Sequence, residues 1–386
     1  MTIQERKAIP IPQVEARAPL PQQNLRVPGP TPVPPEVMAA QAAPMINHRG
    51  PEFAAILQRV TLRMQYFFQT ASPVLTYPAS GTGGQECAVV NVFSPGDHVA
   101  AIIIGNFGMR IAKIAEAYGL QVTRIEFPWG QAADPAVVEA RLKEIAPYRG
   151  VLMTHNETST GVTNDVQTLA ALVRRLNPDA LVVVDAVSSL SAVPLDMDLW
   201  DLDVVLTGSQ KGWMIPPGLT MIAASERAWE AHKTAKLPRF YFDWTSARKS
   251  LETWQNPATP AVSLFYALDV ALEMMLAEGR EAIFARHARA GAYVRERTKK
   301  MGLQLLASDE RYASNTVTAI LAPTGITTKD LLKKLHDEEH IVLATGQDHM
   351  KGKMFRIGHL GHFTEAELVE TMDALERHLR ELGFKG

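Results

Sequence analysis

One lysine and one aspartate follow apolar runs that predict two consecutive strands along the chain. Lys211 lies after Val204–Leu206, and the glycines beside it allow a ligand to approach closely. A lysine in apolar surroundings has a lowered pKa and can attack a carbonyl carbon. Asp185 ends the run Leu181–Val184. A carboxylate buried there needs a cationic partner, such as a protonated pyridine nitrogen. Taken singly, Lys211 is an ordinary loop lysine, and Asp185 equally suits the N-cap of a following helix.

A glycine-rich stretch could bind an anion. Ser80-Gly81-Thr82-Gly83-Gly84-Gln85-Glu86 leads into an apolar helix over Cys87–Phe93. Backbone N–H groups at a helix start form an anion cradle. The stretch lacks the Lys-Ser/Thr pair of a phosphate loop and is not GxGxxG. Alone, it is equally a tight glycine turn.

Two further side chains suit a planar ligand and a carboxylate. Phe107 directly follows a predicted strand, where an aromatic ring could stack on a flat cofactor, although such residues are more often core. Arg356 lies between apolar neighbours in Phe355-Arg356-Ile357-Gly358. A buried arginine suits bidentate pairing with a substrate carboxylate, and a structural salt bridge is the alternative.

Alternating strands and helices must position these residues. Short apolar runs predict buried strands, and amphipathic stretches between them predict helices. This alternation is typical of a mostly parallel sheet between helices, whose ligands lie beyond the carboxyl ends of the strands. The predicted strands are Val99–Ile104, Gly150–Met153, Ala180–Val184 and Val204–Thr207, and the predicted helices are Pro135–Ile145 and Val166–Leu176.

After Pro260 the pattern changes to long helices with a few strands, which predicts a smaller C-terminal α+β domain. Its expected helices and strands are Val262–Glu278, Glu281–Met301, Thr316–Leu321, His340–Ala344 and Glu365–Leu382. We therefore expect an N-terminal arm over 1–24, a large domain over 25–262 that begins with a rigid proline-rich segment, and a small domain over 263–386. The arm either lies on a partner subunit or is disordered.

Composition narrows the class of protein. The 386 residues carry a formal net charge of −2, so no basic excess points to nucleic acid or an anionic membrane. Cys87 is the single cysteine, which excludes an internal disulfide. No apolar run reaches the length of a membrane span, and the N-terminus lacks a signal-peptide core. We expect a cytoplasmic enzyme.

The order of these motifs resembles the class V aminotransferases of fold type I, and within them the alanine–glyoxylate and serine–glyoxylate aminotransferase group. The resemblance covers residues 28 to about 361. The matching segments are Pro28-Gly29-Pro30-Thr31, Ser80-Gly81-Thr82-Gly83-Gly84, Gly105-Asn106-Phe107-Gly108, His155-Asn156-Glu157-Thr158-Ser159-Thr160-Gly161, Asp185-Ala186-Val187-Ser188-Ser189, Gly208-Ser209-Gln210-Lys211-Gly212 and Phe355-Arg356-Ile357-Gly358-His359.

The resemblance implies pyridoxal 5'-phosphate (PLP) as cofactor. Lys211 would form the Schiff base and move the proton at the substrate Cα, and Asp185 would pair with the pyridine nitrogen. Arg356, helped by backbone near Gly29, would bind the substrate carboxylate. The remaining implied contacts are those of Gly83, Gly84 and Gln210 with the phosphate, Phe107 and Val187 with the ring, and Thr158 with the phenolate oxygen.

The resemblance also implies a homodimer with a shared active site. Thr259, in Asn256-Pro257-Ala258-Thr259-Pro260, would reach the neighbour's phosphate. Relatives often carry a tyrosine or paired histidines just before this segment, whereas this chain has Gln255-Asn256-Pro257. The implied reaction is a ping-pong transfer of an amino group from alanine or serine to glyoxylate.

Four alternatives stay open. A cysteine desulfurase is disfavoured, because Cys87 is better read as a small core residue. Another class V transaminase could use ureidoglycine or aminoethylphosphonate, with Asn47-His48-Arg49-Gly50 of the partner as a second cationic site. A non-catalytic subunit with the PLP fold would not need Lys211, Asp185 and Arg356 together. A zinc site is disfavoured, since no carboxylate lies at metal-ligand spacing from the clustered histidines. These histidines are His340, His349, His359 and His362.

Overall fold

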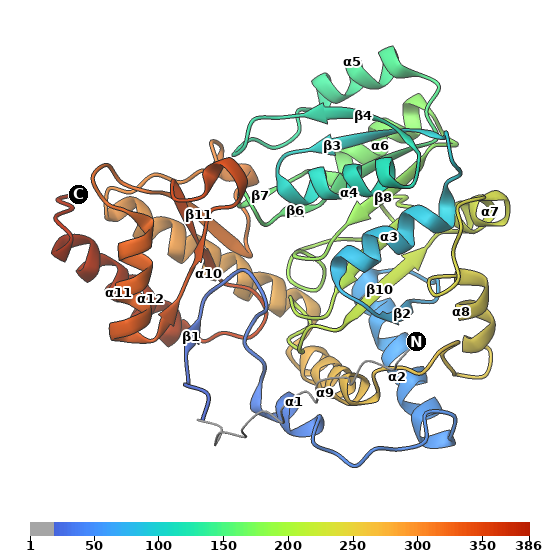
Figure 1. Cartoon of the computed structure of the whole chain (residues 1–386), viewed down its shortest axis with the longest axis horizontal. Coiled ribbons are helices and arrows are strands. Elements are labelled where there is room, and N and C mark those ends of the chain that lie inside the picture. The colour runs from blue at the N-terminus through green and yellow to red at the C-terminus, as the bar shows by residue number, and fades with distance from the viewer. Residues whose placement is uncertain (1–18) are drawn as a thin grey trace, which may run out of the picture.

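A seven-stranded sheet forms the centre of the larger part of the chain, in a computed structural model that describes residues 19–386 (Figure 1). The strand order is β2-β10-β9-β8-β5-β3-β4, with β10 antiparallel to both neighbours and the other pairs parallel. The strands are β2 Leu75–Pro78, β3 His98–Ile103, β4 Gln121–Glu126, β5 Gly150–Thr154, β8 Leu181–Asp185, β9 Val204–Gly208 and β10 Leu219–Ala224. A short hairpin of β6 Asn156–Glu157 and β7 Val162–Thr163 follows β5.

Helices cover both faces of this sheet, as its apolar strands require. Ala100 and Ile102 of β3 pack in one core cluster, and Val99, Ala101 and Ile103 pack in another. Successive side chains of a strand point to opposite faces, so the two clusters are the two sides of one sheet. The covering helices are α1 Pro35–Ala40, α2 Pro51–Phe68, α3 Gly81–Val92, α4 Asn106–Ala117, α5 Pro135–Ile145, α6 Val166–Leu176, α7 Glu226–Thr234, α8 Trp244–Leu251 and α9 Val262–Glu278.

The C-terminal part forms a separate unit of helices packed on a small sheet, with its own hydrophobic core (Figure 1). An antiparallel sheet of order β11-β14-β13 packs against three helices. Its elements are α10 Arg280–Lys300, β11 Val317–Leu321, α11 Thr328–Glu339, β12 Ile341–Val342, β13 Ala344–Thr345, β14 Met354–Gly358 and α12 Glu365–Glu381. Thr364 begins α12 with a capping box, in which its hydroxyl and Glu367 satisfy each other's backbone N–H groups.

The proline-rich segment at the start of the described chain connects both parts. β1, Asn24–Leu25, pairs in parallel with β12, and the N–H of Gly358 donates to the carbonyl of Arg26. Further along, the N–H of Thr31 donates to the carbonyl of Gln210 in the large part, at 3.1 Å. The segment therefore runs from the small sheet to the Lys211 loop. The predicted arm lies mostly outside the described residues.

Three local features differ from the sequence expectations. The glycine stretch is the first turn of α3 rather than a preceding turn, and Ser80 is its N-cap. No helix follows Asp185, because residues 187–192 form turns, so the alternative as a helix cap is wrong. The predicted strand His340–Ala344 is divided at Leu343 into β12 and β13, which pair with different partners.

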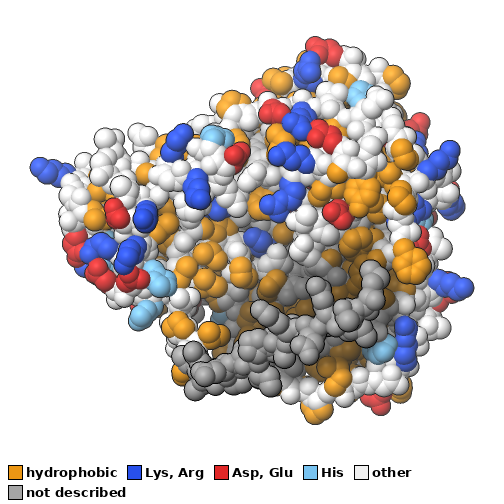
Figure 2. All heavy atoms as spheres, viewed as in Figure 1, with side chains coloured by type: hydrophobic (Ala, Val, Ile, Leu, Met, Phe, Trp, Pro, Cys, Tyr) orange, Lys and Arg blue, Asp and Glu red, His pale blue; other side chains and the backbone are white. Residues whose placement is uncertain are grey.

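The surface carries interspersed charges of both signs, with hydrophobic side chains gathered on the lower half of the face in Figure 2. Among residues 19–386, no helix is both long and apolar enough to cross a bilayer.

Asp203 anchors the amino end of β9 from a fully buried position. Its carboxylate accepts from the N–H of Val182 at 2.7 Å and from the hydroxyl of Ser225 at 2.7 Å. It also pairs with Arg227, at 3.0 Å, and with Arg174. The same two arginines pair with Asp201, whose side chain is 53% exposed.

We predict that Asp203→Asn lowers the free energy of unfolding by about 3 kcal/mol, because it leaves two guanidinium groups facing an uncharged buried amide. Asp201→Asn is the matched control, since an exposed pair contributes at most about 1 kcal/mol. Urea unfolding followed by far-UV circular dichroism measures both variants. Equal losses would contradict the assigned role of Asp203.

Candidate active site

Lys211 lies in a buried loop beyond the carboxyl end of β9, and 8% of its surface is exposed. Its ammonium nitrogen donates to the carbonyl oxygen of Pro28 at 2.5 Å. Gly29, at φ +139°, leaves room for this lysine, because a Cβ there would lie 2.5 Å from the Lys211 Nζ atom. The proline-rich segment thus forms one wall around the amine, with Gly29 beside the Lys211 side chain.

Burial lowers the pKa of Lys211 to about 8. The positive charges of Arg356 and Arg110 contribute to this lowering, and the carboxylate of Asp185 opposes it. About a tenth of the amine is therefore uncharged at pH 7, far more than for an ordinary lysine, and the uncharged amine is the form that attacks a carbonyl.

Asp185 is buried at the carboxyl end of β8, beside β9. It accepts from the Gln85 side-chain amide at 2.5 Å and from the N–H of Val187 at 2.9 Å. Burial raises the pKa of its carboxyl group, and these two hydrogen bonds oppose the rise. Within residues 19–386, no lysine or arginine nitrogen comes within 4.0 Å of Asp185, so this buried acceptor has no direct ion pair.

The N-terminus of α3 lies beside the Lys211 loop and can receive an anion. N–H groups in the first turn of a helix have no partner within it, which leaves those of Gly81 and Thr82 to a ligand. Gln210 adds a buried side-chain oxygen without a hydrogen-bond partner, and its amide lies close to Gly208.

The predicted phosphate ligands Gly83 and Gly84 fit this cradle less well. The N–H of Gly84 donates to the carbonyl of Ser80, and a Cβ at Gly84 would lie 2.3 Å from the Thr220 hydroxyl. Gly84 therefore serves the close packing of α3 on β10. The N–H of Gly83 contacts the Ser80 hydroxyl at 3.4 Å. Val187 packs against Gly81 at the edge of the cradle.

Phe107 lies in the first turn of α4, where the buried carboxylate of Glu157 fixes it. This carboxylate accepts from the N–H groups of Phe107 and Gly108, each at 3.0 Å, and from the hydroxyl of Ser159 at 2.6 Å. The guanidinium of Arg110 covers one face of the Phe107 ring, 4.7 Å from its centroid. Arg110 also donates to the Thr82 hydroxyl at 3.0 Å, which brings positive charge to the α3 cradle.

Arg356 extends from β14 of the small part to the same place. Its guanidinium donates to the carbonyl of Thr158 at 3.1 Å and to that of Thr345 at 2.9 and 3.1 Å. Carbonyl dipoles thus hold a charge that burial disfavours, and burial lowers the pKa of Arg356 to about 10. The Thr158 hydroxyl donates to Ser188 at 2.7 Å, just beyond Val187.

Thr259 is the one predicted site residue that the single chain leaves exposed and apart from this pocket. Its segment is held by Arg49, which donates to the Gln255 side chain at 3.0 Å and to the Asn256 carbonyl at 2.7 Å. The two stretches predicted to act on a partner subunit therefore contact each other.

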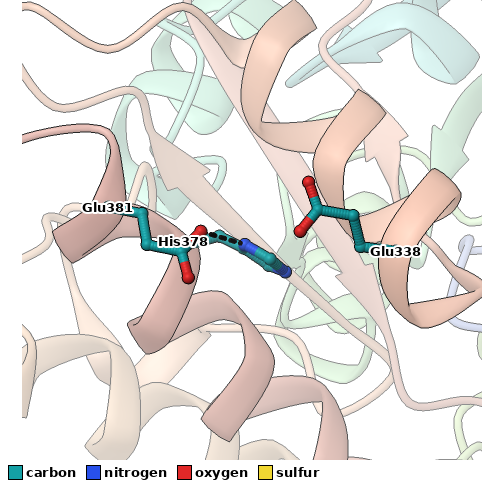
Figure 3. Close-up of side chains that lie close together, drawn as sticks. All are labelled: Glu338, His378 and Glu381. Carbon is teal, nitrogen blue, oxygen red and sulfur yellow. Dashed lines mark hydrogen bonds and ion pairs between the residues drawn. The ribbon is translucent and has the colours of Figure 1, made fainter.

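The histidines considered for zinc are not brought together. His359 bonds to Thr318 and the Asn315 carbonyl, and His349 packs on Trp129. A different group, Glu338, His378 and Glu381, has ligand atoms within 4.8 Å of one another (Figure 3). The Lys334 ammonium lies 2.7 Å from Glu338 and 3.2 Å from Glu381, so a side-chain cation already offsets this charge.

Sequence reasoning missed three polar residues of the site. Gln85 holds Asp185, Glu157 holds Phe107, and Arg110 lies against both Phe107 and Thr82. A signal existed for two of them, because Gln85 lies in the glycine-rich stretch named as an anion cradle and Glu157 in a segment that carries the family resemblance. Arg110 lies one helical turn after Phe107, a spacing that places both side chains on one face.

We predict that Lys211 reacts with formaldehyde and a mild reductant at a rate that rises with pH through about 8 and then levels off. Arg356→Gln removes a positive charge and should move this midpoint to higher pH, whereas Asp185→Asn removes a negative charge and should move it lower. Peptide mass spectrometry of the cofactor-free protein measures both shifts. A midpoint near that of exposed lysines, or shifts of the same sign, would contradict the assigned electrostatics.

Comparison with known proteins agrees with this geometry. The family model described as Aminotransferase class-V matches residues 27–371. A protein named soluble hydrogenase, small subunit, from Synechococcus is 44% identical over 93% of this chain and 94% of its own. A serine–glyoxylate aminotransferase of Arabidopsis thaliana is 36% identical over 94% and 92% of the two chains. The solved structure of an alanine–glyoxylate aminotransferase from Nostoc superposes with a TM-score of 0.90 at 28% identity, over 98% of this chain and 100% of that one. The chain belongs to the class V aminotransferase family and has its fold.

Proposed function

We propose that this class V aminotransferase uses PLP bound at Lys211 to transfer the amino group of a small amino acid, alanine or serine, to glyoxylate. The observation that carries the proposal is the buried Lys211 amine, whose pKa is about 8, within electrostatic reach of the buried side chains of Asp185 and Arg356. Keeping three ionisable groups out of water is costly, and ligands that complement them would offset that cost.

The pocket fits the cofactor group by group. The Gly81 and Thr82 N–H groups, the Gln210 amide and the Arg110 guanidinium suit a phosphate. Asp185 would pair with the ring nitrogen, and that positive charge would lower the raised pKa of its carboxyl group. The ring would lie between Val187 and Phe107, with its phenolate oxygen at Thr158.

The residues then divide the work of transamination. PLP, when bound, supplies a ring that withdraws electrons from the substrate Cα. Lys211, released by the incoming amine, would remove the proton from the substrate Cα and deliver it to the C4′ atom of the cofactor. Arg356 would hold the substrate carboxylate with the N–H groups that Thr158 and Thr345 do not use. Burial of the loop limits access of water.

The choice of substrates is supported by the relatives and by the site. The Arabidopsis and Nostoc relatives are named for serine or alanine with glyoxylate. Arg356 is the clamp that the pocket offers to a single carboxylate, which suits glyoxylate and short donors. A phosphonate donor would need a second cationic group beside Arg356. Arg49 would have to leave its contacts with Gln255 and Asn256 to supply one.

A second copy of the chain would complete the site. Thr259 is exposed and would reach the partner's phosphate. Large apolar side chains are exposed on α1, on α2, on the loop between them and on the loop before α8, which is where a dimer would bury surface; they are Met38, Met45, Leu62, Tyr66, Phe240 and Tyr241. These residues support the homodimer implied by the sequence.

The name of the Synechococcus relative raises the alternative of a subunit in a redox complex. The chain has one cysteine, Cys87, and iron–sulfur clusters are usually held by several thiolates. Cys87 is fully buried, and burial raises the pKa of its thiol, which also argues against a desulfurase nucleophile. The intact Lys211 pocket favours the transaminase.

We predict that Lys211→Ala lowers the rate of amino transfer from alanine and serine by at least about a thousandfold, because both the covalent anchor and the proton carrier are lost. Lys233→Ala, at an exposed lysine on α7, is the control and should react as wild type. Stopped-flow absorbance of the PLP-loaded protein with single amino acids measures the donor step. Full turnover by Lys211→Ala would overturn the proposal, and a wild type inert to every donor would favour the non-catalytic subunit.

We predict that Thr259→Asp also abolishes activity, by repelling the phosphate of the partner's site. Mixing this variant with Lys211→Ala should restore about a quarter of wild-type activity, because half the dimers would carry one intact site of two. Coupled assays after joint refolding measure the recovery. Heterodimers without recovered activity would show that Thr259 does not act across the interface.

A further inference from the structure

The turn that follows β13 crosses from the small part of the molecule to the large sheet. Gln347 accepts a hydrogen bond from the side-chain amide of Asn106 at 3.3 Å. Two residues later, the His349 ring contacts the Trp129 ring edge-to-face, with centroids 4.6 Å apart. Gly346 keeps the turn tight, because a Cβ there would lie 2.2 Å from the Met350 carbonyl oxygen. Two contacts and one tight turn therefore fix Gln347.

Gln347 is bracketed by the groups that would hold the substrate. On one side, the carbonyl of Thr345, two residues earlier, accepts from Arg356. On the other side, Asn106 precedes Phe107 at the start of α4. Consider a donor whose carboxylate is held by Arg356 and whose amino group faces Lys211. Its side chain would then lie between Thr345 and Asn106, next to Gln347.

We propose that Gln347, held by Asn106, determines donor specificity by receiving the donor's side chain with neutral amide groups. The inference rests on the proposed transaminase function and deepens it. With its oxygen used by Asn106, Gln347 retains amide N–H groups that can donate to a serine hydroxyl or lie beside a methyl group. Gln347 itself offers a side-chain carboxylate no positive charge to offset its lost hydration, so acidic donors are disfavoured.

The test compares serine, alanine and aspartate as donors to the PLP-loaded enzyme. For wild type, kcat/KM should be highest for serine and alanine. Gln347→Arg supplies a cation and should raise the ratio of kcat/KM for aspartate over serine by about tenfold or more. Gln347→Glu keeps the size of the side chain and should lower the same ratio.

Asp348→Asn is the matched control. It changes the local charge by the same amount and sign as Gln347→Arg, in the next residue, on a side chain that is 68% exposed. Asparagine also tolerates the positive φ of this position, which is +47°. This variant should leave the donor ratio unchanged. An equal shift in the control would assign the effect to the general field and overturn the role of Gln347.

The glyoxylate half-reaction separates specificity from structural damage, because glyoxylate has no side chain. Its rate from the aminated enzyme should change less than twofold in both Gln347 variants. A donor ratio that does not move, or a glyoxylate step that falls in parallel with the donor step, would overturn the inference while leaving the transaminase intact. Absence of turnover with every donor in wild type would instead refute the proposed function.

Discussion

Two opposite charges are buried in one pocket without touching each other, and the rest of the site is arranged around them. The Lys211 ammonium and the Asp185 carboxylate lie beyond the carboxyl ends of the neighbouring strands β9 and β8. Burial shifts both pKa values toward the uncharged forms. A direct ion pair would have held both groups charged, so their separation keeps the amine reactive and leaves the carboxylate for a cation of the ligand.

Holding that separation requires segments distant in the sequence. Pro28 and Gly29 form the wall beside the amine, and Gln85 of α3 fixes the carboxylate. Arg356 arrives from the small part, and its charge is held by one backbone carbonyl of each part, those of Thr345 and Thr158. Pro28 contacts the Lys211 amine, and Arg356 lowers its pKa, so both parts of the molecule act on this one group.

Much of this arrangement follows from local sequence patterns. The strand ends predict Lys211 and Asp185, because an apolar run that stops at a polar residue marks the rim of a parallel sheet. The helices over 135–145, 166–176 and 262–278 have the predicted bounds, since each is clearly delimited by its flanking residues. The sequence patterns do not predict β2, β4 and β10, and periodicity in any case does not distinguish the antiparallel β10 from a parallel strand.

The rest depends on contacts that no local pattern encodes. Gln85 meets Asp185 across 100 residues, and Glu157 meets Phe107 across 50. Gly84 resembles a phosphate ligand in sequence, yet its missing Cβ admits Thr220 of β10. The position of Gln347 depends on how the small sheet faces α4, which only the assembled fold determines.

The most direct measurement is to load the protein with PLP, reduce it with borohydride and map the modified peptide by mass spectrometry. If the buried amine of Lys211 is the reactive group, a phosphopyridoxyl group should be found on Lys211 at one per chain. Label on another lysine, or no label while the protein remains folded, would contradict the central role of this residue.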